Sequence, residues 1–427
     1  MIPKLFRDPV HNIISLDTHD PCDRVLIGLI GTPEVQRLRH IRQLGLANLV
    51  YPGAEHSRFT HSLGVTHLAR RIIDQVAGAG ADPAMRLRTL AAALLHDIGH
   101  GPFSHAIEKV TQIDHEEIGV ALLLDPDSGV HAVLSAVDPT LPAEVAAMIK
   151  GEGPRTFYRD VVSSQLDADR LDYILRDGLA TGVKIGVYDL ERILTTLEAD
   201  PHHLLINSRA KEAVEGYLMA RFHMYKQIYL HKAVRSAEKM LEAALGRAAA
   251  LLREAPGSLA PVAPALGGLL RGERVEAAAL ARLDDADVHV ALKAWAAGPD
   301  PILAELSGGL VGRRLFKTLA LPRDPARAGA IVAAGREVAR REGCDPEHHL
   351  LVDRAEDTPY RPYEPGATAG QKPIMLSIEG GQGRIEDHSD IVHLLGRDRY
   401  EVQRICFPER LRPALLSRLQ REGLIPS

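Results

Sequence analysis

Residues 94–105, LLHDIGHGPFSH, place three histidines and an aspartate at the end of an apolar run of alanine and leucine. The adjacent His96 and Asp97 offer a neutral nitrogen ligand beside an anionic oxygen ligand. That pair suits Mn²⁺, Fe²⁺ or Zn²⁺, and its carboxylate tolerates Mg²⁺. Glycines and a proline follow the pair and end the helix. Because the pair lies at the end of an apolar helix, its backbone is held in place while its side chains can face a cavity. One metal ion needs more protein ligands than these two.

Further candidate ligands lie upstream and downstream of this pair. His61 falls early in an amphipathic pattern over residues 60–79, and QLDADRLDYILRD, residues 165–177, offers several carboxylates. Asp167, Asp169 and Asp172 cannot all share one helix face, because only i, i+3 and i, i+4 neighbours do. A His, His-Asp and Asp set from three helices would close one metal site with positions open for water and substrate. Asp167 and Asp172 are alternatively structural partners of arginines.

The alternative for any single histidine is a structural role, because a lone helical histidine is usually a hydrogen-bonded residue of the core. Clustering argues for chemistry in this case, since 10 of the 20 histidines lie within residues 1–115. Four other histidines of that stretch are given a structural role or none: His11, His40, His56 and His67.

Composition limits the class of protein. The 427 residues are 45% hydrophobic and only 4% aromatic, which together with abundant alanine and leucine predicts a mostly helical protein. A formal charge of −5 argues against bulk electrostatic binding to nucleic acid or anionic lipid. Three scattered cysteines, an N-terminus without a long apolar core and the lack of any apolar run of about 18 residues predict a cytoplasmic protein without a membrane span.

Periodicity and cap signals place the motifs on elements. Helices are predicted over 32–45, 60–79, 84–97, 114–124, 142–150, 160–177, 209–253 (one or two helices) and 408–421. A hairpin is predicted near LTTLEADPHHLLIN, where a proline-containing turn separates two β-leaning runs. Shorter helices are expected over 275–345, and strands are expected from 349 onward.

Several motifs in a fixed order carry a family resemblance. They are FRDPVHN, TPEVQRLRHIRQLG, YPGAEHSRFTHSLGV, LLHDIGHGPFSH, DHEEIG, LDADRLDYILRD and YKQIYLHK, and together they cover most of residues 4–235. The chain resembles the HD-domain metal-dependent phosphohydrolases, and within them the SAMHD1-like branch that hydrolyses deoxynucleoside triphosphates. The resemblance implies a mainly α fold with an HD-domain helical core, which we place over 1–253 because the composition changes near residues 253–268. The remaining residues match no motif, and their patterns are interpreted as a helical extension over 254–345 and a small α+β C-terminal lobe over 346–427.

The resemblance also implies roles for individual residues. The ligands of one divalent metal ion (Mn, Fe, Mg or Zn) would be His61, His96, Asp97 and Asp169. Catalytic roles would fall to His115, the best match to a catalytic histidine, to His100 and to the shared ligand Asp169. Phosphate contacts would come from Arg58, His105, Arg170, Tyr173, Arg221 and Lys232; Arg221 and Lys232 are alternatively ordinary solvated residues. The sugar or base side would be formed by Gln43, Leu44, Asp177, Tyr225 and Tyr229.

The implied reaction is hydrolysis of a dNTP to a deoxynucleoside and triphosphate, by attack of metal-activated water on the α-phosphorus. Other nucleotide phosphoesters remain alternatives: a dinucleoside polyphosphate such as Ap4A, a dNMP, a cyclic dinucleotide or (p)ppGpp. A nucleotide or nucleic-acid sensor on the same fold would be expected to lack a ligand. The resemblance implies a homo-oligomer, dimer or tetramer. An allosteric nucleotide is a further prediction, although Gly31 stands where some family members carry a guanine-reading aspartate.

Overall fold

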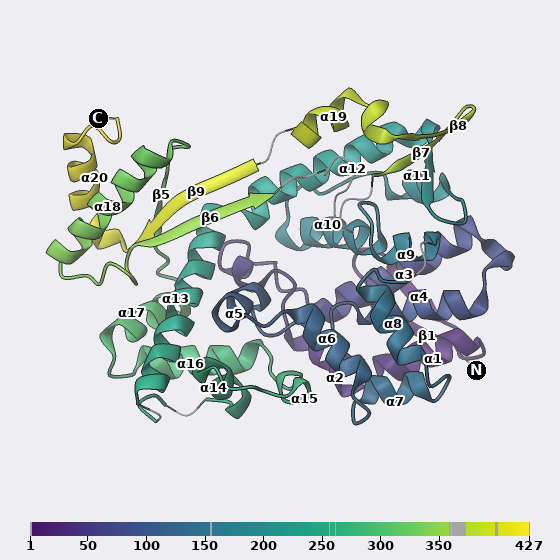
Figure 1. The fold of residues 1–427 in the computed structure, drawn as a ribbon, viewed down its shortest axis with the longest axis horizontal. Coiled ribbons are helices and arrows are strands. Elements are labelled where there is room, and N and C mark those ends of the chain that lie inside the picture. The colour runs from purple at the N-terminus through teal and green to yellow at the C-terminus, as the bar shows by residue number, and fades with distance from the viewer. Residues whose placement is uncertain are drawn as a thin grey trace.

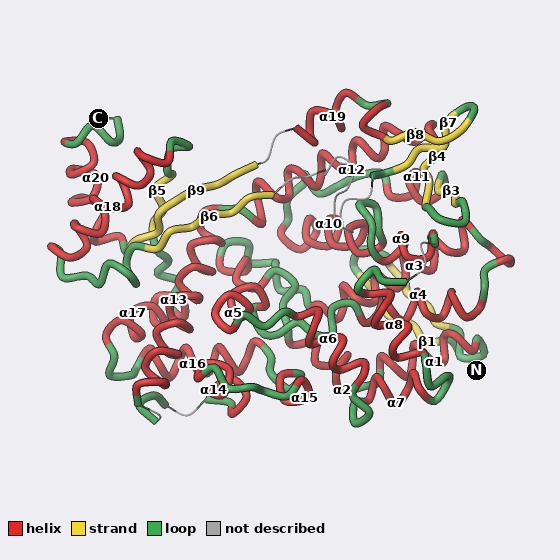
Figure 2. Tube along the Cα trace, viewed as in Figure 1, coloured by secondary structure: helices red, strands yellow, loops and turns green. Residues whose placement is uncertain are grey.

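The computed structural model describes residues 2–153, 156–255, 257–260, 262–357, 360, 373–397 and 400–426, with the backbone alone at 104, 105, 356, 357 and 400. Helices dominate, and short sheets lie at the periphery and in the C-terminal region (Figures 1 and 2). The predicted fold class, mainly α with a small α+β lobe, is confirmed.

The first hydrophobic core is built mainly from the N-terminal half of the chain, and it also contains Tyr360, Ile374, Leu376, Ile385 and Val392. Its helices are α1 (Pro21–Ile30), α2 (Pro33–Arg37), α3 (Arg58–Val76), α4 (Pro83–Leu95), α6 (His115–Leu124), α7 (Gly129–Ser135), α8 (Leu141–Ile149), α9 (Phe157–Val162), α10 (Ala168–Thr181), α11 (Leu190–Thr195) and α12 (Lys211–Met224). Strands β1 (Lys4–Asp8) and β2 (Asn12–Leu16) form an antiparallel hairpin beside it. The second half of α4 is continuously buried from Thr89 to Leu95, so this helix rigidly delivers His96 at its C-terminal end.

The prediction of one helix over 160–177 is wrong, because the structure has two helices there, α9 and α10. The chain breaks between α9 and α10 because the buried Asp167 caps α10, and its carboxylate accepts hydrogen bonds from the backbone N–H groups of Ser164 and Arg170. A second break lies within 209–253, where a π-helical turn at Tyr225–Tyr229 separates α12 from α13 (Lys232–Glu254). π-turns of this kind re-aim side chains and occur often at functional sites.

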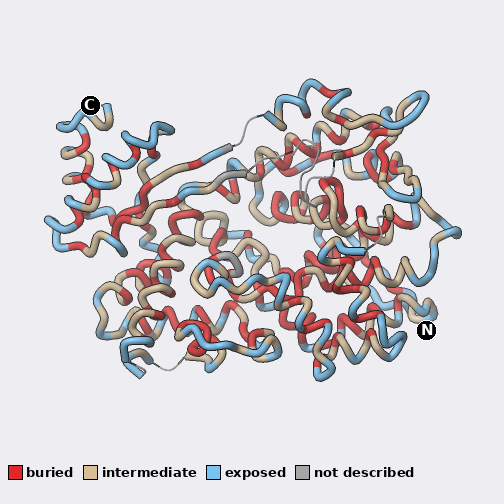
Figure 3. Tube along the Cα trace, in the orientation of Figure 1, coloured by how far each residue is buried: buried red, intermediate tan, exposed pale blue. Residues whose placement is uncertain are grey.

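A second hydrophobic core surrounds α13. It is closed by α5 (Ser104–Thr111), α14 (Pro264–Arg271), α15 (Ala277–Leu280), α16 (Asp285–Ala296) and α17 (Pro301–Val311). Buried residues recur along α13 from Val234 to Leu252, and Figure 3 shows exposed residues along the outer side of this group of helices. The stretch 275–345 was expected to hold helices only, but it also contains strand β5 (Lys317–Ala320), whose pairing partner lies far along the chain.

The C-terminal residues occupy two separate places (Figure 1). Strands β5, β9 (Tyr400–Phe407) and β6 (Leu351–Asp357) form one antiparallel sheet, covered by α18 (Pro325–Arg341) and α20 (Arg412–Arg421). Strands β7 (Met375–Ile378) and β8 (Gly381–Arg384) instead join the predicted hairpin β3 (Leu197–Ala199) and β4 (Leu204–Asn207), and α19 (Asp390–Arg397) lies beside α12. A division at residue 346 therefore groups segments that the structure separates, because the β4–β7 pairing is long-range.

Among the described residues, no single helix is long and apolar enough to cross a membrane; only the bent pair α6 and α7 has sufficient length and composition when taken together.

The turn after α4 is packed against α6 through a glycine. A Cβ built on Gly99 would lie 2.0 Å from the carbonyl oxygen of His115 and 2.4 Å from the backbone nitrogen of Gly119. We expect Gly99→Ala to lower the free energy of unfolding by about 1–3 kcal/mol, as overpacking usually does. Thermal denaturation checks this. Gly101→Ala is the matched control, since its added Cβ meets nothing within 4 Å; equal melting temperatures for the two variants would contradict the prediction.

Candidate active site

A cavity of about 710 Å³ lies between the first and second cores. Its walls come from the loop at residues 42–47, the start of α3, the end of α4, α5 with the start of α6, α10, the π-turn and α13. Its volume falls within the range of sites for small molecules and cofactors. Segments far apart in the sequence therefore meet around one space.

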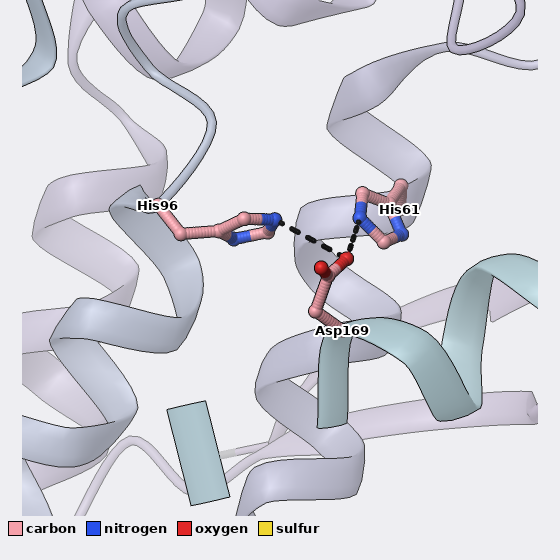
Figure 4. A group of neighbouring side chains, drawn as sticks. All are labelled: His61, His96 and Asp169. Atoms are coloured by element: carbon pink, nitrogen blue, oxygen red, sulfur yellow. Dashed lines mark ion pairs between the residues drawn. The ribbon is translucent and has the colours of Figure 1, made fainter. Parts of the chain in front are cut away.

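Three predicted metal ligands converge at one end of this cavity (Figure 4). Oδ1 of Asp169 lies 3.0 Å from Nε2 of His61 and 3.7 Å from Nε2 of His96. Asp97 adds oxygens 3.3 Å from Nε2 of His96 and 4.0 Å from Nε2 of His61. Helices α3, α4 and α10 thus present two imidazoles and two carboxylates to a common point.

The other nitrogen of each imidazole is already occupied. Nδ1 of His61 lies 2.8 Å from a carboxylate oxygen of Asp172, and Nδ1 of His96 lies 2.9 Å from the carbonyl oxygen of Ala93. A hydrogen on each Nδ1 leaves the Nε2 lone pairs facing Asp97 and Asp169, which is the usual arrangement of metal-binding histidines. Nε2 of His96 is buried and makes no hydrogen bond to any described residue.

The electrostatics favour positive charge at this point. Burial by itself lowers the pKa of His61, but hydrogen bonds to Asp169 and Asp172 outweigh it and raise the pKa to about 10. An environment that stabilises a proton this strongly also stabilises a cation. Nitrogen and carboxylate donors together fit a divalent transition metal, whereas Mg²⁺ would be coordinated by the carboxylate oxygens alone. The residues present therefore fit a divalent ion.

Asp97 contacts both Arg58 and the histidines of the candidate metal site. A guanidinium nitrogen of Arg58 donates to Oδ2 of Asp97 at 2.6 Å, and both side chains are nearly buried. Burial raises the pKa of Asp97, but the opposing charges of His96 and Arg58 hold it well below its usual range. Asp97 therefore stays ionised, which both a metal ligand and an arginine partner require.

A second cluster of titratable groups adjoins the first. The rings of His100 and His115 stack with centroids 3.8 Å apart, and Nε2 of His100 lies 3.2 Å from Oδ1 of Asp97. Nδ1 of His115 lies 2.8 Å from a carboxylate oxygen of Glu108. Burial lowers the pKa of His115, but Glu108 outweighs it and the pKa is raised above the ordinary histidine value. This geometry suits a proton donor held by a carboxylate.

The predicted phosphate contacts fall in three places. Arg170 and Tyr173 line the cavity, and Arg170 is also paired with the buried Asp167. Arg221 is buried behind Tyr225, its guanidinium 5.5 Å from that ring, and is not among the residues that line the cavity.

Lys232 lines a different cavity of about 390 Å³, together with Arg313, Lys317 and Arg412. The structure therefore does not bring it to the predicted site. The side chain of His105 lies outside the described residues.

The predicted sugar and base contacts all line the cavity: Gln43, Leu44, Asp177, Tyr225 and Tyr229. The carboxylate of Asp177 accepts the Tyr229 hydroxyl at 2.7 Å and lies 2.8 Å from Nε2 of His56. Oε1 of Gln43 is buried and bonds to no described residue, so it remains available to a ligand.

Sequence reasoning named one supporting residue, Asp172, and missed the roles of two others, Glu108 and His56. Asp172 orients His61 and pairs with Arg176, so its role as a structural partner of an arginine is borne out alongside a contact to the metal end of the cavity. Neither Glu108 nor His56 had a recognisable signal in the sequence, because Glu108 contacts His115, 7 residues away, and His56 contacts Asp177, 121 residues away.

Comparisons with known proteins agree with this site. An HD domain model matches residues 58–173, and a model of an HD associated region matches residues 188–260. The chain is 37% identical to the uncharacterized protein YwfO of Bacillus subtilis over 411 residues, which are 96% of this chain and 93% of YwfO. A crystal structure of a phosphohydrolase from Bacteroides thetaiotaomicron superposes with a TM-score of 0.81 at 31% identity, covering 95% of this chain and all of that one.

The chain belongs to the HD-domain phosphohydrolase family. The HD match contains the four candidate ligands, and the associated region contains the π-turn. The SAMHD1 homolog of Dictyostelium discoideum, a deoxynucleoside triphosphate triphosphohydrolase, is 29% identical over 269 residues, 58% of this chain. This chain spans about half the length of that relative, since the match covers 50% of it.

We expect the double variant His96→Ala/Asp97→Ala to fold and to lose its bound metal, because it removes one nitrogen and one oxygen donor from the set. Elemental analysis of the purified protein measures the metal, and circular dichroism measures the fold. His40→Ala, an exposed histidine outside the cavity, is the control and should keep wild-type metal content. Equal metal content in both variants would contradict the assignment of these ligands.

Proposed function

We propose that this HD-domain phosphohydrolase hydrolyses deoxynucleoside triphosphates to a deoxynucleoside and triphosphate. One observation carries the proposal: a set of metal-binding side chains and a set of basic and aromatic side chains line the same cavity. A triphosphate bound with its α-phosphorus at the metal end would be flanked by Arg58 and Arg170, whose charges offset its own. The names of the SAMHD1 relatives support the choice of substrate.

The proposed metal ligands are His61, His96, Asp97 and Asp169. A divalent ion held there supplies a coordinated water of lowered pKa and polarises a phosphoryl oxygen. In the proposed reaction, water attacks the α-phosphorus, the bond to the 5′-oxygen breaks, and His115 donates a proton to the departing oxygen. His100 stacks on His115 and fixes its ring plane, while Glu108 favours its protonated form.

The sugar side is proposed to select deoxyribose. Gln43 and Leu44 lie on one wall, and Tyr225 and Tyr229 lie on the π-turn that faces the same cavity. The two tyrosine rings meet edge to face with centroids 4.8 Å apart. We propose that Gln43 and Leu44 lie against the 2′-carbon, where close packing would exclude a ribose hydroxyl, and that the tyrosines flank the sugar or base.

We further propose a cytoplasmic homo-oligomer, dimer or tetramer, with a nucleotide as substrate and no requirement for nucleic acid. An allosteric nucleotide near residues 36–39 remains a prediction. There, Gln36 already accepts from Arg39 and donates to the carbonyl oxygen of Ile30, so such a ligand would have to replace these contacts.

A product assay tests the proposal. The protein, loaded with Mn²⁺ or Mg²⁺, is incubated with the four dNTPs singly and mixed, and with NTPs, dNMPs, Ap4A, (p)ppGpp and cyclic dinucleotides. Deoxynucleoside together with intact triphosphate is the expected result, and activity only in the mixture would reveal an allosteric nucleotide. Cleavage of another phosphoester with silence on every dNTP would overturn the substrate, and silence throughout with metal bound would favour a sensor.

We expect Glu108→Gln to lower kcat by at least about tenfold at neutral pH, because His115 loses the carboxylate that favours its protonated form. The direction in which the pH–rate profile moves follows from the direction of the pKa shift of His115. Glu108 raises the pKa of His115, so its loss lowers that pKa, and the alkaline limb of the pH–rate profile moves to lower pH. The measurement is kcat across pH for each protein.

Glu117→Gln is the matched control, an exposed glutamate on the same helix as His115 that does not line the cavity. It should leave both kcat and the alkaline limb in place. An unchanged profile in Glu108→Gln would remove His115 from the role of proton donor.

A further inference from the structure

Asp285 is a buried carboxylate that joins two loops of the cavity. It lies at the start of α16, beyond both family-model matches, and is 5% exposed. Its Oδ2 accepts the backbone N–H of Arg42 at 3.0 Å and a guanidinium nitrogen of the same residue at 3.5 Å. Its Oδ1 accepts the backbone N–H of Phe103 at 3.2 Å. One side chain thus fixes the backbone of two segments that line the cavity.

The backbone held at Phe103 is strained. Phe103 has φ of 47°, in the left-handed region that residues with a side chain rarely adopt. Such a conformation persists only where surrounding contacts hold it, and it tends to occur at functional sites. Phe103 lines the cavity, and its Cδ1 would lie 3.9 Å from a Cβ built on Gly45, in the loop that carries Gln43 and Leu44.

The residues just before α16 are also linked, through Arg37, to the turn that follows His96 and Asp97. The buried guanidinium of Arg37 donates to the carbonyl oxygens of Ile98 at 2.7 Å and His100 at 2.9 Å, and also to that of Leu283 at 2.9 Å. Apolar contacts reinforce this link. Leu46 and Phe103 are buried in the second core together with residues of α16, not in the first core that holds α3 and α4.

We infer that Asp285 is a positioning residue of the active site, which sets the distance between the loop that carries Gln43 and Leu44 and the turn that carries His100 and Phe103. The helical extension is in this way part of the substrate site. The kinetic consequence rests on the proposed function, whereas the structural consequence can be measured without any substrate.

The test compares Asp285→Ala and Asp285→Asn with the wild type. Hydrogen exchange followed by mass spectrometry reports peptides that contain Arg42 and Phe103. In Asp285→Ala, both amides should exchange about tenfold faster, because each loses its acceptor. Asp285→Asn keeps one oxygen and places an NH₂ group against the other donor, so it should restore protection at only one of the two loops.

Kinetics on the substrate identified by the product assay give the second readout. We expect KM to rise about tenfold in Asp285→Ala with a smaller change in kcat, because the substrate walls move while the metal ligands stay in place. The KM of Asp285→Asn should lie between those of Asp285→Ala and the wild type. The metal content of both variants should equal that of the wild type.

Asp300→Ala is the control for a merely structural loss. Asp300 caps α17 in the same extension and pairs with Arg247, and it does not line the cavity. It should lower the melting temperature without altering KM or exchange at Arg42 and Phe103. Unchanged exchange in Asp285→Ala, or an equal rise of KM in Asp300→Ala, would overturn the inference. If the wild type cleaves no phosphoester, the proposed function fails while the exchange measurement still decides this inference.

Discussion

The carboxylate of Asp172 is fully buried where the N-terminal hairpin, α3 and α10 meet, and a buried charge is tolerated only when it is well paired. One oxygen lies 2.6 Å from Nε2 of His11, the other lies 2.8 Å from Nδ1 of His61, and Arg176 donates to both. The same contacts that satisfy this charge aim Nε2 of His61 at the proposed metal. Gly64 makes the arrangement possible, because a Cβ there would lie 2.0 Å from Oδ1 of Asp172.

The cavity depends on the placement of α13 between the second hydrophobic core and the cavity. This helix contributes its apolar face to the second core, while Arg235, Glu238 and Leu241 line the cavity. Arg235 in turn donates to the fully buried Asp353 of β6 at 2.5 Å, and Ala355 of the same strand also lines the cavity. The α+β lobe is therefore physically continuous with the site, although the family models match only earlier residues.

Local signals predicted the elements that carry the ligands. The run of alanine and leucine predicted a helix over 84–97, and α4 ends at Leu95, directly before the predicted metal ligands His96 and Asp97. The break at Asp167 was missed because an aspartate inside a helical pattern reads equally as a surface residue or a cap. Strand β5 and the parallel β4–β7 pairing were also missed, since their partners lie 80 or more residues away and leave no local pattern.

The sequence by itself determined the candidate chemistry: the types and helical spacing of the histidines and aspartates predicted a metal site, and the order of the motifs carried the resemblance to the HD-domain phosphohydrolases. Only the tertiary structure decided which side chains share the cavity. It placed Lys232 in another cavity and Arg221 behind Tyr225, and it brought in Glu108 and Asp285. The physical reason is that ligand type is a property of each residue, whereas proximity depends on long-range packing and on buried hydrogen bonds that link distant segments.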